Sequence, residues 1–282
     1  MGSDAGVARR LEHYEECRDA INGLFNEALN NRPDKAFQEF LAFAQRFSGL
    51  SVFNAMLLRV QMPGVTAVAT ARKWALRGRY PKPGAWPLVI LQPFGPVLFV
   101  YALEDTEGEE VEGERSNSLS ASGAIGTCTF DHIVKKAEEQ GVRVSVAAYG
   151  TTLAGFAQAG HRIYAKRFEL TGSSHRWDVI VNSNFDAPSR YATLAHELGH
   201  VYCGHLGGHP GGRWPPRTHL GVAERELEAE AVAWLVSNRN GVVPKSADYL
   251  SLHATRADLA AISMFSILDA ANRIEARTAK RQ

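Results

Sequence analysis

Apolar residues recur at every third or fourth position in two stretches of the N-terminal part, from Val7 to about Asn30 and from Pro33 to Phe47. This period corresponds to one face of an α-helix, so we expect two amphipathic helices. The stretch SVFNAMLLRVQM continues the helical pattern as far as Pro63, and ARKWALRG predicts a further short helix. WPLVILQP and PVLFVYAL are apolar runs separated by the turn FG, and they predict two strands.

A strongly polar segment follows. Residues 104–114 contain seven acidic residues, and RSNSLSASG lies directly after them. Such a composition predicts a linker or a long exposed loop. Beyond it, FDHIVKKAEEQ has a helical pattern, whereas VRVSVAAYG, RIYAKRFEL and RWDVIVNS are typical of strands. We therefore expect a domain at 1–110, a linker rich in acidic residues and serine at 111–124, and a second domain at 125–282.

Three helices are expected in the C-terminal part. The first contains ATLAHELGHVYCGHL and is capped by Asp186 or Ser189, with Pro188 in its first turn. The second begins near Val222, and the third runs from about Thr255 to Ala276. Because helices and strands occur in both parts of the chain, the sequence predicts an α+β protein with a smaller α+β domain first.

Composition narrows the class of protein. The chain has 282 residues, of which 45% are hydrophobic, as expected of a globular protein. A net charge of +1 argues against a binder of nucleic acids that is basic throughout. The cysteines, Cys17, Cys128 and Cys203, form no spaced framework and favour a reducing compartment. The N-terminus lacks the apolar core of a signal peptide, and no apolar run reaches the roughly 18 residues of a membrane span. We expect a soluble, cytoplasmic protein.

The stretch YATLAHELGHVYCGHLG, residues 191–207, contains a candidate metal site. On a helix, His196 and His200 lie one turn apart on the same face, and Glu197 flanks the point where their imidazoles would hold an ion. This is the His-Glu-x-x-His arrangement of zinc peptidases, in which the glutamate acts as the base. A surface helix with two unrelated histidines is the alternative interpretation.

The third ligand does not come from the same segment. In the longer pattern His-Glu-x-x-His-x-x-Gly-x-x-His, Cys203 would stand at the glycine and Leu206 at the last histidine, so the pattern fails. His205 and His209 lie nearby but not at the position that the pattern requires, and each is more typical of a polar loop residue than of a ligand. Cys203 shares the helical face of the histidines, although a free cysteine is more often a packed apolar residue.

The later segment VAERELEAEAVAWLVSN offers four glutamates. A helical projection puts Glu226 and Glu230 within the apolar arc, and Glu224 and Glu228 outside it beside Arg225. Burial of an unpaired carboxylate costs on the order of several kcal/mol, so two carboxylates on an apolar face indicate a cation or a histidine partner. We expect Glu226 as the third ligand and Glu230 as the group that orients a ligand histidine. The alternative is a different rotation of the helix, with all four glutamates solvated.

Three protein ligands would leave the fourth position of one zinc ion per chain open for water, as in catalytic sites. Zinc lowers the pKa of water to about 7, and Glu197 would take the proton so that a carbonyl group can be attacked. The sequence leaves the additional donor to the oxyanion open among five residues, Tyr191, Tyr202, Tyr249, His205 and His253. The edge of a strand before the metal helix would suit an extended peptide.

Together, ATLAHELGHVYCGHL, ERELEAEAVAWLV and YLSLHA resemble the ImmA/IrrE-type zinc metallopeptidases over residues 140–260. The resemblance implies a zincin-like fold for the second domain, with a small mixed sheet against helices. In that family the first glutamate of a Glu-x-Glu-Ala or Glu-x-x-x-Asn pattern is the third zinc ligand, and Glu226 occupies this position, with Glu230 four residues later. Members fused behind an ArdC-like antirestriction domain resemble this chain especially.

Residues 51–91 are similar to the ArdC-like single-stranded-DNA-binding domain. Independently, the chain between Phe40 and Leu103 has seven Lys or Arg residues and no Asp or Glu, with aromatic residues between them. Basic groups neutralise phosphates and aromatic rings stack on bases, although an ordinary core with a solvated basic face is the alternative. The candidate nucleic-acid-binding residues are Asn54, Arg59, Gln61, Arg72, Lys73, Trp74, Arg77 and Lys82.

The leading hypothesis is a zinc-dependent endopeptidase that its N-terminal domain recruits to single-stranded or damaged DNA, or to a DNA-bound protein. One alternative is an antirestriction-type protein that binds single-stranded DNA and has a structural or vestigial zinc site. Another is a regulatory protease that cleaves a repressor. Glu197 beside both histidines favours an enzyme, because a structural site does not use a base. The expected partners are a protein substrate and DNA or a DNA-bound protein, and no membrane.

Overall fold

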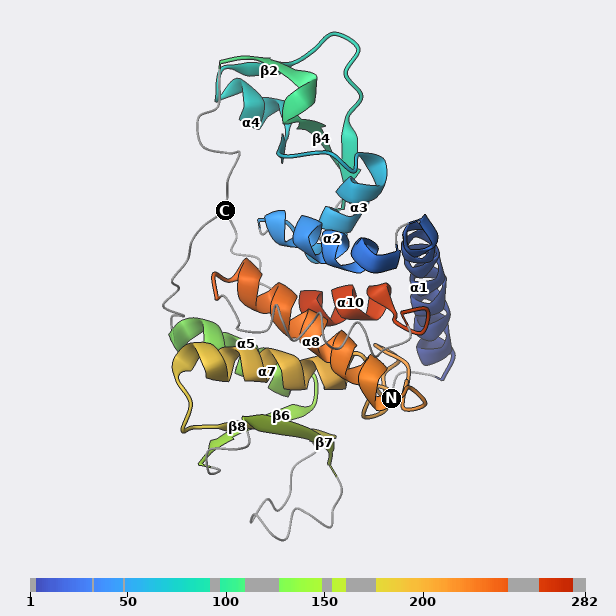
Figure 1. Cartoon of the computed structure of the whole chain (residues 1–282), viewed down its shortest axis with the longest axis vertical. Helices are drawn as coiled ribbons and strands as arrows, with labels where there is room; N and C mark the ends of the chain where they lie inside the picture. Colours follow the sequence, from blue (N-terminus) through green and yellow to red (C-terminus); the bar gives the residue numbers. More distant parts are fainter. Residues whose placement is uncertain are drawn as a thin grey trace. The chain divides into compact units, whose positions relative to one another are not determined.

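The computed structural model describes residues 4–31, 33–47, 49–91, 97–109, 127–148, 154–160, 176–242 and 259–275. The chain forms two compact units, of which unit 1 comprises Met1–Gln38 and Ala121–Gln282, and unit 2 comprises Glu39–Ser120. Each unit combines helices with small sheets (Figure 1), so the predicted α+β class is confirmed. In the described part of the chain, no helix has both the length and the apolar character to span a membrane.

Unit 1 contains a mixed sheet of three strands, β6 (Val142–Ala147), β7 (Gly155–Ala159) and β8 (Trp177–Asn182). β8 lies in the middle, parallel to β6 and antiparallel to β7. Every residue of β8 is buried, which explains its almost continuous apolar pattern. The sequence pattern predicts β6 and β8 but misses β7, and the predicted strand RIYAKRFEL lies outside the described residues.

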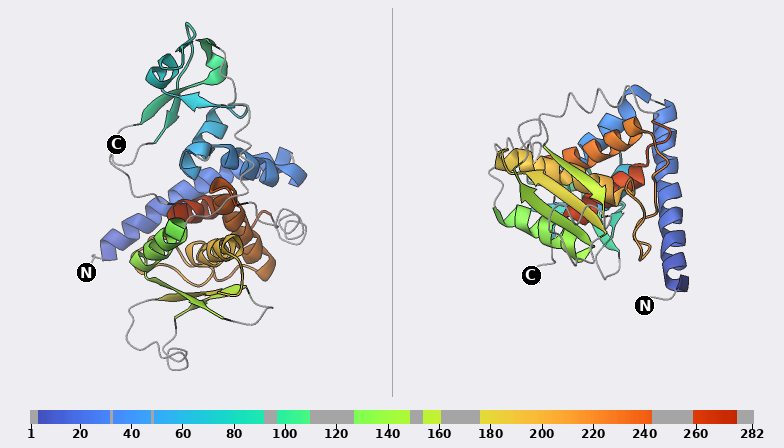
Figure 2. Two further views of the ribbon diagram at one scale, coloured as in Figure 1. Left: turned by 90° about the vertical axis from the view of Figure 1, so that its left-hand side faces the viewer. Right: turned by 90° about the horizontal axis from the view of Figure 1, so that it is seen from below.

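Four helices of unit 1 form its core with the sheet. They are α5 (Thr127–Glu139), α7 (Ala187–Tyr202), α8 (Val222–Arg239) and α10 (Met264–Glu275). α5 and α7 lie over one face of the sheet, and α8 and α10 pack on the side of α7 away from the sheet (Figures 1 and 2). This confirms the predicted small mixed sheet beside a histidine helix and a glutamate helix. α10 begins later than predicted, because Leu259–Ala261 form a turn.

The ends of α7 are set by local sequence. The Asp186 side chain caps the helix by accepting a hydrogen bond from the backbone N–H of Ser189 at 2.8 Å, as one of the two predicted caps would. The helix ends at Tyr202, and Gly204 then adopts a φ of +80°. A side chain at Gly204 would also collide with the backbone oxygen of Pro215. The turn at Gly204 brings His205 back beside α7, where its N–H donates to the His200 carbonyl at 3.0 Å.

Small residues bring α7 and α8 close together. A Cβ atom at Gly199 would lie 3.1 Å from Cα of Ala229 and 3.3 Å from Cβ of Val232. Only glycine therefore fits on α7 at this crossing without moving the backbone of α8. The close approach brings the glutamates of α8 within reach of the histidines of α7.

Helix α1 (Asp4–Asn31) packs on α10. The Tyr14 hydroxyl lies 3.3 Å from Oγ of Ser266, and Oδ1 of Asn22 accepts a hydrogen bond from the Phe265 N–H at 3.1 Å. Met1–Gln38 consequently belongs to unit 1, which differs from the predicted first domain at 1–110. The linker at 111–124 lies outside the described residues, and the extents of the functional domains stay a prediction.

Unit 2 begins within α2 (Pro33–Arg46) and continues with α3 (Val52–Gln61) and α4 (Ala71–Ala75). An antiparallel sheet has the order β1 (Val68–Ala69), β4 (Leu98–Ala102), β3 (Leu88–Ile90). A second pair joins β2 (Arg79–Pro81) to β5 (Thr106–Gly108), with a short 3₁₀ helix, η1 (Leu103–Asp105), before β5. The prediction of a loop at 104–114 is therefore wrong for residues 104–108, because residues 104 and 105 are part of η1 and residues 106–108 pair with β2.

Candidate metal centre

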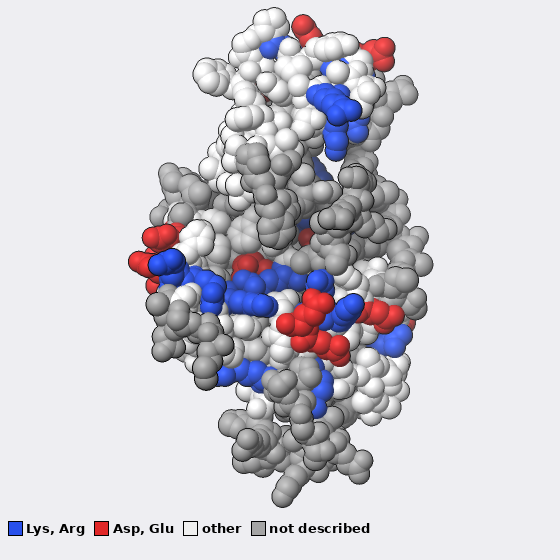
Figure 3. All heavy atoms as spheres, turned by 180° about the vertical axis from the view of Figure 1, so that it is seen from behind, with Lys and Arg blue, Asp and Glu red and all other residues white. Residues whose placement is uncertain are grey.

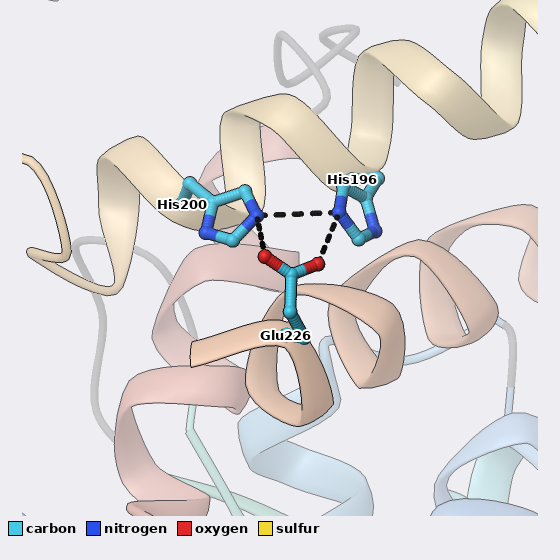
Figure 4. A group of neighbouring side chains, drawn as sticks. All are labelled: His196, His200 and Glu226. Atoms are coloured by element: carbon cyan, nitrogen blue, oxygen red, sulfur yellow. Dashed lines mark hydrogen bonds and ion pairs between the residues drawn. The ribbon is translucent and has the colours of Figure 1, made fainter. Parts of the chain in front are cut away.

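Three side chains from α7 and α8 converge on one point (Figure 4). Nε2 of His196 lies 3.4 Å from Oε2 of Glu226, and Nε2 of His200 lies 3.5 Å from Oε1 of the same carboxylate. The two Nε2 atoms are 3.2 Å apart. The structure thus brings together the three residues that the sequence analysis selects as metal ligands.

The separations of these atoms fit a small tetrahedral ion. With metal–ligand distances of about 2.0–2.1 Å, the ligand atoms of a tetrahedral zinc site lie about 3.3 Å from one another. The two Nε2 atoms, 3.2 Å apart, agree with that value, and the Glu226 carboxylate presents Oε2 to His196 at 3.4 Å and Oε1 to His200 at 3.5 Å. Nitrogen and carboxylate oxygen are also ligands that zinc accepts. His196, His200 and Glu226 can therefore hold a metal ion.

Each histidine has a hydrogen-bond partner at its other ring nitrogen. Nδ1 of His196 lies 3.1 Å from Oε2 of Glu230, the residue expected to orient a ligand histidine. Nδ1 of His200 lies 3.0 Å from Nδ1 of His205. Such contacts hold an imidazole in one orientation and keep Nε2 directed at the metal position.

Glu197 lies beside the three candidate ligands without being one of them. Its residue surface is 9% exposed, and the backbone N–H of Ala157 on β7 donates to its carboxylate. Burial and the negative charge of Glu226 raise the pKa of Glu197 to about 7, while the charge of His196 acts in the opposite direction. A general base works best when its pKa lies near the operating pH, so this carboxylate is suited to move a proton.

The pKa values of the two histidines are driven apart. Burial by itself would lower the pKa of His196, but hydrogen bonds to Glu226 and Glu230 raise it to about 10. Burial and the positive charge of His196 lower the pKa of His200 to about 3. A cation bound by the Nε2 atoms would repel the proton on His196, so binding of a metal releases a proton at neutral pH.

The candidate ligands line a pocket of about 340 Å³. Its walls also include Gly155, Phe156 and Ala157 of β7, together with Leu206 and Arg225. Among the lining residues, Arg225 carries the permanent positive charge. A volume of this size matches sites for small molecules or for a few residues of a peptide.

The helical projection is wrong for Glu228. It places this residue outside the apolar arc, whereas the side chain is 0% exposed and Glu226 is the one at the pocket rim, with a side chain 36% exposed. The reason is that α8 packs against α7 on one side and α10 on another, so it has more than one buried face. Hydrogen bonds from His205 and Arg217 and the charge of Arg217 outweigh the effect of burial and hold the pKa of Glu228 below its usual value.

The candidates for the additional oxyanion donor find little support. Tyr191 and Tyr202 are buried and do not line the pocket, and Tyr249 and His253 lie outside the described residues. His205 lines the pocket, but both of its ring nitrogens have partners. Arg225 also lines the pocket, and its position directly before Glu226 is the signal in the sequence that could have indicated it.

Cys203 and His209 also lie near the motif and are of residue types that can bind metals, but both make packing contacts instead. Cys203 is buried, and its Sγ donates to the Ser266 carbonyl at 3.6 Å, in keeping with a packed residue. The His209 ring lies 4.7 Å from the ring of Trp214, and its Nδ1 accepts a hydrogen bond from the Gly211 N–H. Neither residue belongs to the group of His196, His200 and Glu226.

In unit 2, two of the candidate nucleic-acid-binding residues hold the edge of β3. The Gln61 amide donates to the Val89 carbonyl and accepts from the Val89 N–H, both at 2.8 Å. The Asn54 amide makes the same pair of bonds with Leu91, at 2.9 and 2.8 Å. These amides therefore pair with the backbone of Val89 and Leu91 as a neighbouring strand would.

Trp74 is also a core residue. Its side chain is 0% exposed, and its Nε1 donates to the Tyr101 carbonyl at 2.9 Å. A base could not reach either face of a ring in this position. The prediction that Trp74 binds nucleic acid by stacking is therefore wrong, and the ring packs in the core. Among the described residues of unit 2, Trp86 is 85% exposed, and Tyr80 and Phe99 are more than half exposed.

The basic residues among the candidates for nucleic-acid binding differ in their contacts and exposure. The Arg59 guanidinium lies 5.6 and 5.5 Å from the rings of Phe40 and Phe43, and Nζ of Lys82 donates to the Glu104 carbonyl at 2.8 Å. Arg72, Lys73 and Arg77 are exposed on α4 and the turn after it. On the face of unit 2 that Figure 3 draws, several Lys and Arg side chains are visible, with acidic side chains at the edge of the same unit.

Comparison with known families agrees with the geometry of α7 and α8. Residues 137–238 match the model of the peptidase M78 family, the IrrE N-terminal-like domain. The matched segment includes all of α7, nearly all of α8 and no residue of unit 2. The resemblance to ImmA/IrrE-type proteins is confirmed for this segment.

Two solved structures align with most of the chain. Both are of the antirestriction protein ArdC from the R388 plasmid, one bound to Mn(II) and one free of metal. Each is 15% identical, and they cover 82% and 80% of this chain and 84% and 81% of their own, with TM-scores of 0.36 and 0.33. No curated protein sequence matches this chain significantly.

Proposed function

We propose that unit 1 is a zinc-dependent endopeptidase with one zinc ion held by His196, His200 and Glu226. The observation that carries this proposal is the position of the Glu197 carboxylate, which lines the same pocket as the three candidate ligands and accepts a hydrogen bond from the Ala157 N–H. A site that only stabilises the fold is closed by its protein ligands and has no use for a base. A pocket with three ligands and a base beside them is suited to hydrolysis.

The chain supplies the proton transfers. Zinc, when bound, provides Lewis acidity and makes water acidic enough to react at neutral pH. Glu197 accepts the proton of the attacking water and delivers it to the nitrogen of the departing amine. Glu230 keeps the His196 ring in place during these steps. Arg225 lies where its charge can polarise a carbonyl group or hold a carboxylate of the substrate.

The substrate we propose is an extended polypeptide. β7 is the outer strand of its sheet on the pocket side, and its outer edge is not paired with any described strand. An extended peptide can add to such an edge through backbone hydrogen bonds. At Gly155 a Cβ atom would lie 2.6 Å from Cγ2 of Thr193 and 3.6 Å from Cγ of Glu197, so β7 lies directly against α7. The scissile bond would then be close to Glu197.

The substitution Glu197→Gln tests this function. The amide keeps the size of the side chain and removes the base, so the variant should retain one zinc per chain and lose cleavage. The assay uses zinc-loaded protein with a peptide library read by mass spectrometry, and elemental analysis and thermal unfolding serve as controls. Cleavage by Glu197→Gln at the rate of the unmodified protein would refute the proposed role of the base.

We further propose that unit 2 recruits the peptidase to single-stranded DNA or to a DNA-bound protein. The support is the stretch between Phe40 and Leu103, which has seven basic residues and no acidic ones, together with the exposed rings of Tyr80, Trp86 and Phe99. Exposed rings stack on bases and exposed cations neutralise phosphates. The partners would then be DNA and a protein substrate, in the cytoplasm.

A further inference from the structure

A second group of metal-binding side chains lies directly beside the candidate zinc site. Cys203, His205 and Glu228 are buried, and their donor atoms lie within 4.8 Å of one another. Such a set could hold a second ion or could support the first. The hydrogen bonds of Glu228 decide between these two roles.

Glu228 has no oxygen left for a metal ion. Nη1 of Arg217 donates to Oε2 at 2.5 Å, and Nη2 donates to Oε1 at 2.6 Å. The Ser263 N–H also donates to Oε1, at 2.7 Å, and Nε2 of His205 lies 2.9 Å from Oε2. The guanidinium group already neutralises the carboxylate and would repel a cation. The group is therefore not a second metal site.

The same contacts determine which ring nitrogens of His205 and His200 carry a proton. A carboxylate only accepts hydrogen bonds, so His205 must carry its proton on Nε2, and its Nδ1 must be an acceptor. Nδ1 of His200, which lies 3.0 Å from that atom, must then be the donor. This leaves the lone pair of His200 on Nε2, the atom that faces Glu226.

We propose that His205 and Glu228, the latter held by Arg217, form a positioning relay that presents Nε2 of His200 to the metal. The inference rests on the proposed zinc site and assigns His205 neither as a ligand nor as a catalytic residue. Nδ1 of His196 has the corresponding contact with Glu230. The side chains of His205 and Glu228 are 0% exposed, whereas that of Glu230 is 12% exposed.

Two substitutions of His205 test the relay. Phe keeps the approximate shape of the ring but removes both hydrogen bonds, so His205→Phe should lower zinc affinity by about 10- to 100-fold. Asn places a carbonyl oxygen near the position of Nδ1, so His205→Asn should recover most of that affinity. His209→Phe is the matched control, because His209 packs against Trp214 and touches no candidate ligand.

Zinc affinity is measured by competition with a chromophoric chelator, and cobalt(II) absorption reports the geometry of the bound ion. Unfolding of the metal-free proteins measures the structural cost of each substitution. Unchanged zinc affinity in His205→Phe would overturn the relay, as would an equal loss in His209→Phe. Failure of the unmodified protein to bind zinc would instead overturn the proposed function, and this inference with it.

One measurement needs no variant. Nitrogen-15 NMR of the unmodified metal-free protein distinguishes the two neutral forms of a histidine ring. The relay requires His200 to carry its proton on Nδ1 and His205 to carry its proton on Nε2. A His200 ring protonated on Nε2 instead would overturn the proposal even if His205→Phe does not fold.

Discussion

Replacement of Gly199 by alanine should weaken metal binding although Gly199 touches no ligand. The new Cβ atom would lie 3.1 Å from Cα and 3.3 Å from the carbonyl oxygen of Ala229, closer than ordinary van der Waals contact. Both atoms belong to the backbone of α8, so no side-chain rotation can relieve the contact. α8 must therefore move away from α7 by a few tenths of an ångström.

The size of this movement matters because metal sites tolerate little error. Ligand distances in a working site lie within about 0.2 Å of their ideal values. Glu226 is on the helix that moves, whereas His196 and His200 are on the other, so the separation of the ligands increases. We expect zinc affinity to fall about tenfold, which corresponds to about 1.4 kcal/mol.

Global stability should change less than zinc affinity. Overpacking costs about 1–3 kcal/mol, whereas alanine is favoured over glycine within a helix by about 1 kcal/mol. The free energy of unfolding of the metal-free protein should therefore fall by about 0–2 kcal/mol.

Chelator competition and denaturant unfolding measure the two quantities. Gly23→Ala is the control, because Gly23 is an exposed residue of α1 with no atom within 4 Å of its added Cβ. It should gain up to about 1 kcal/mol of stability and bind zinc normally. If Gly199→Ala binds zinc as tightly as the unmodified protein, the packing of the two helices does not set the geometry of the site.

Three further predictions concern the ligands, the pH dependence and unit 2. Elemental analysis should show loss of zinc in Glu226→Gln but not in Glu224→Gln, because Glu224 does not line the pocket; the opposite result would mean that the third ligand is wrong. Because the pKa of His196 is raised to about 10, zinc must displace a proton from it, so apparent zinc affinity should rise about tenfold per pH unit from pH 7 to 9; an affinity independent of pH would contradict this. Fluorescence anisotropy with single-stranded oligonucleotides over a salt series should show weaker binding by Trp86→Ala at every salt concentration. For Arg72→Ala or Lys73→Ala, the slope of log K against log salt should be flatter by up to about 0.7. No binding at low salt would mean that the stretch between Phe40 and Leu103 is an ordinary core with a basic face.

The sequence predicts the parts of the site that depend on local spacing. His196 and His200 are four residues apart on one helix, so their proximity follows from helix geometry alone. Selection of Glu226 needs a helical projection and a family resemblance, because it depends on how α7 and α8 pack. The projection fails for Glu228, since it assumes one buried face and α8 has two.

Other features require the folded chain. His205 lies beyond the end of α7 and reaches His200 only because Gly204 turns the backbone. β7 has the sequence GFAQA, which contains no β-branched residue, so its pattern does not indicate a strand. In unit 2 the mixture of basic and aromatic residues is visible in the sequence, but it does not show that Trp74 is buried and Trp86 exposed.

The two buried faces of α8 explain why an exposed ligand can be held in place. Glu226 has a side chain 36% exposed, and a side chain at a pocket rim has little packing of its own to orient it. The helix itself is held by hydrogen bonds on two sides. On one side Glu230 contacts His196, and on the other Glu228 accepts from Arg217 and from the Ser263 N–H just before α10. Loss of one partner from a fully buried ion pair costs about 3–5 kcal/mol, so rotation of α8 about its axis is strongly opposed. The orientation of Glu226 thus depends on contacts on the opposite side of its own helix.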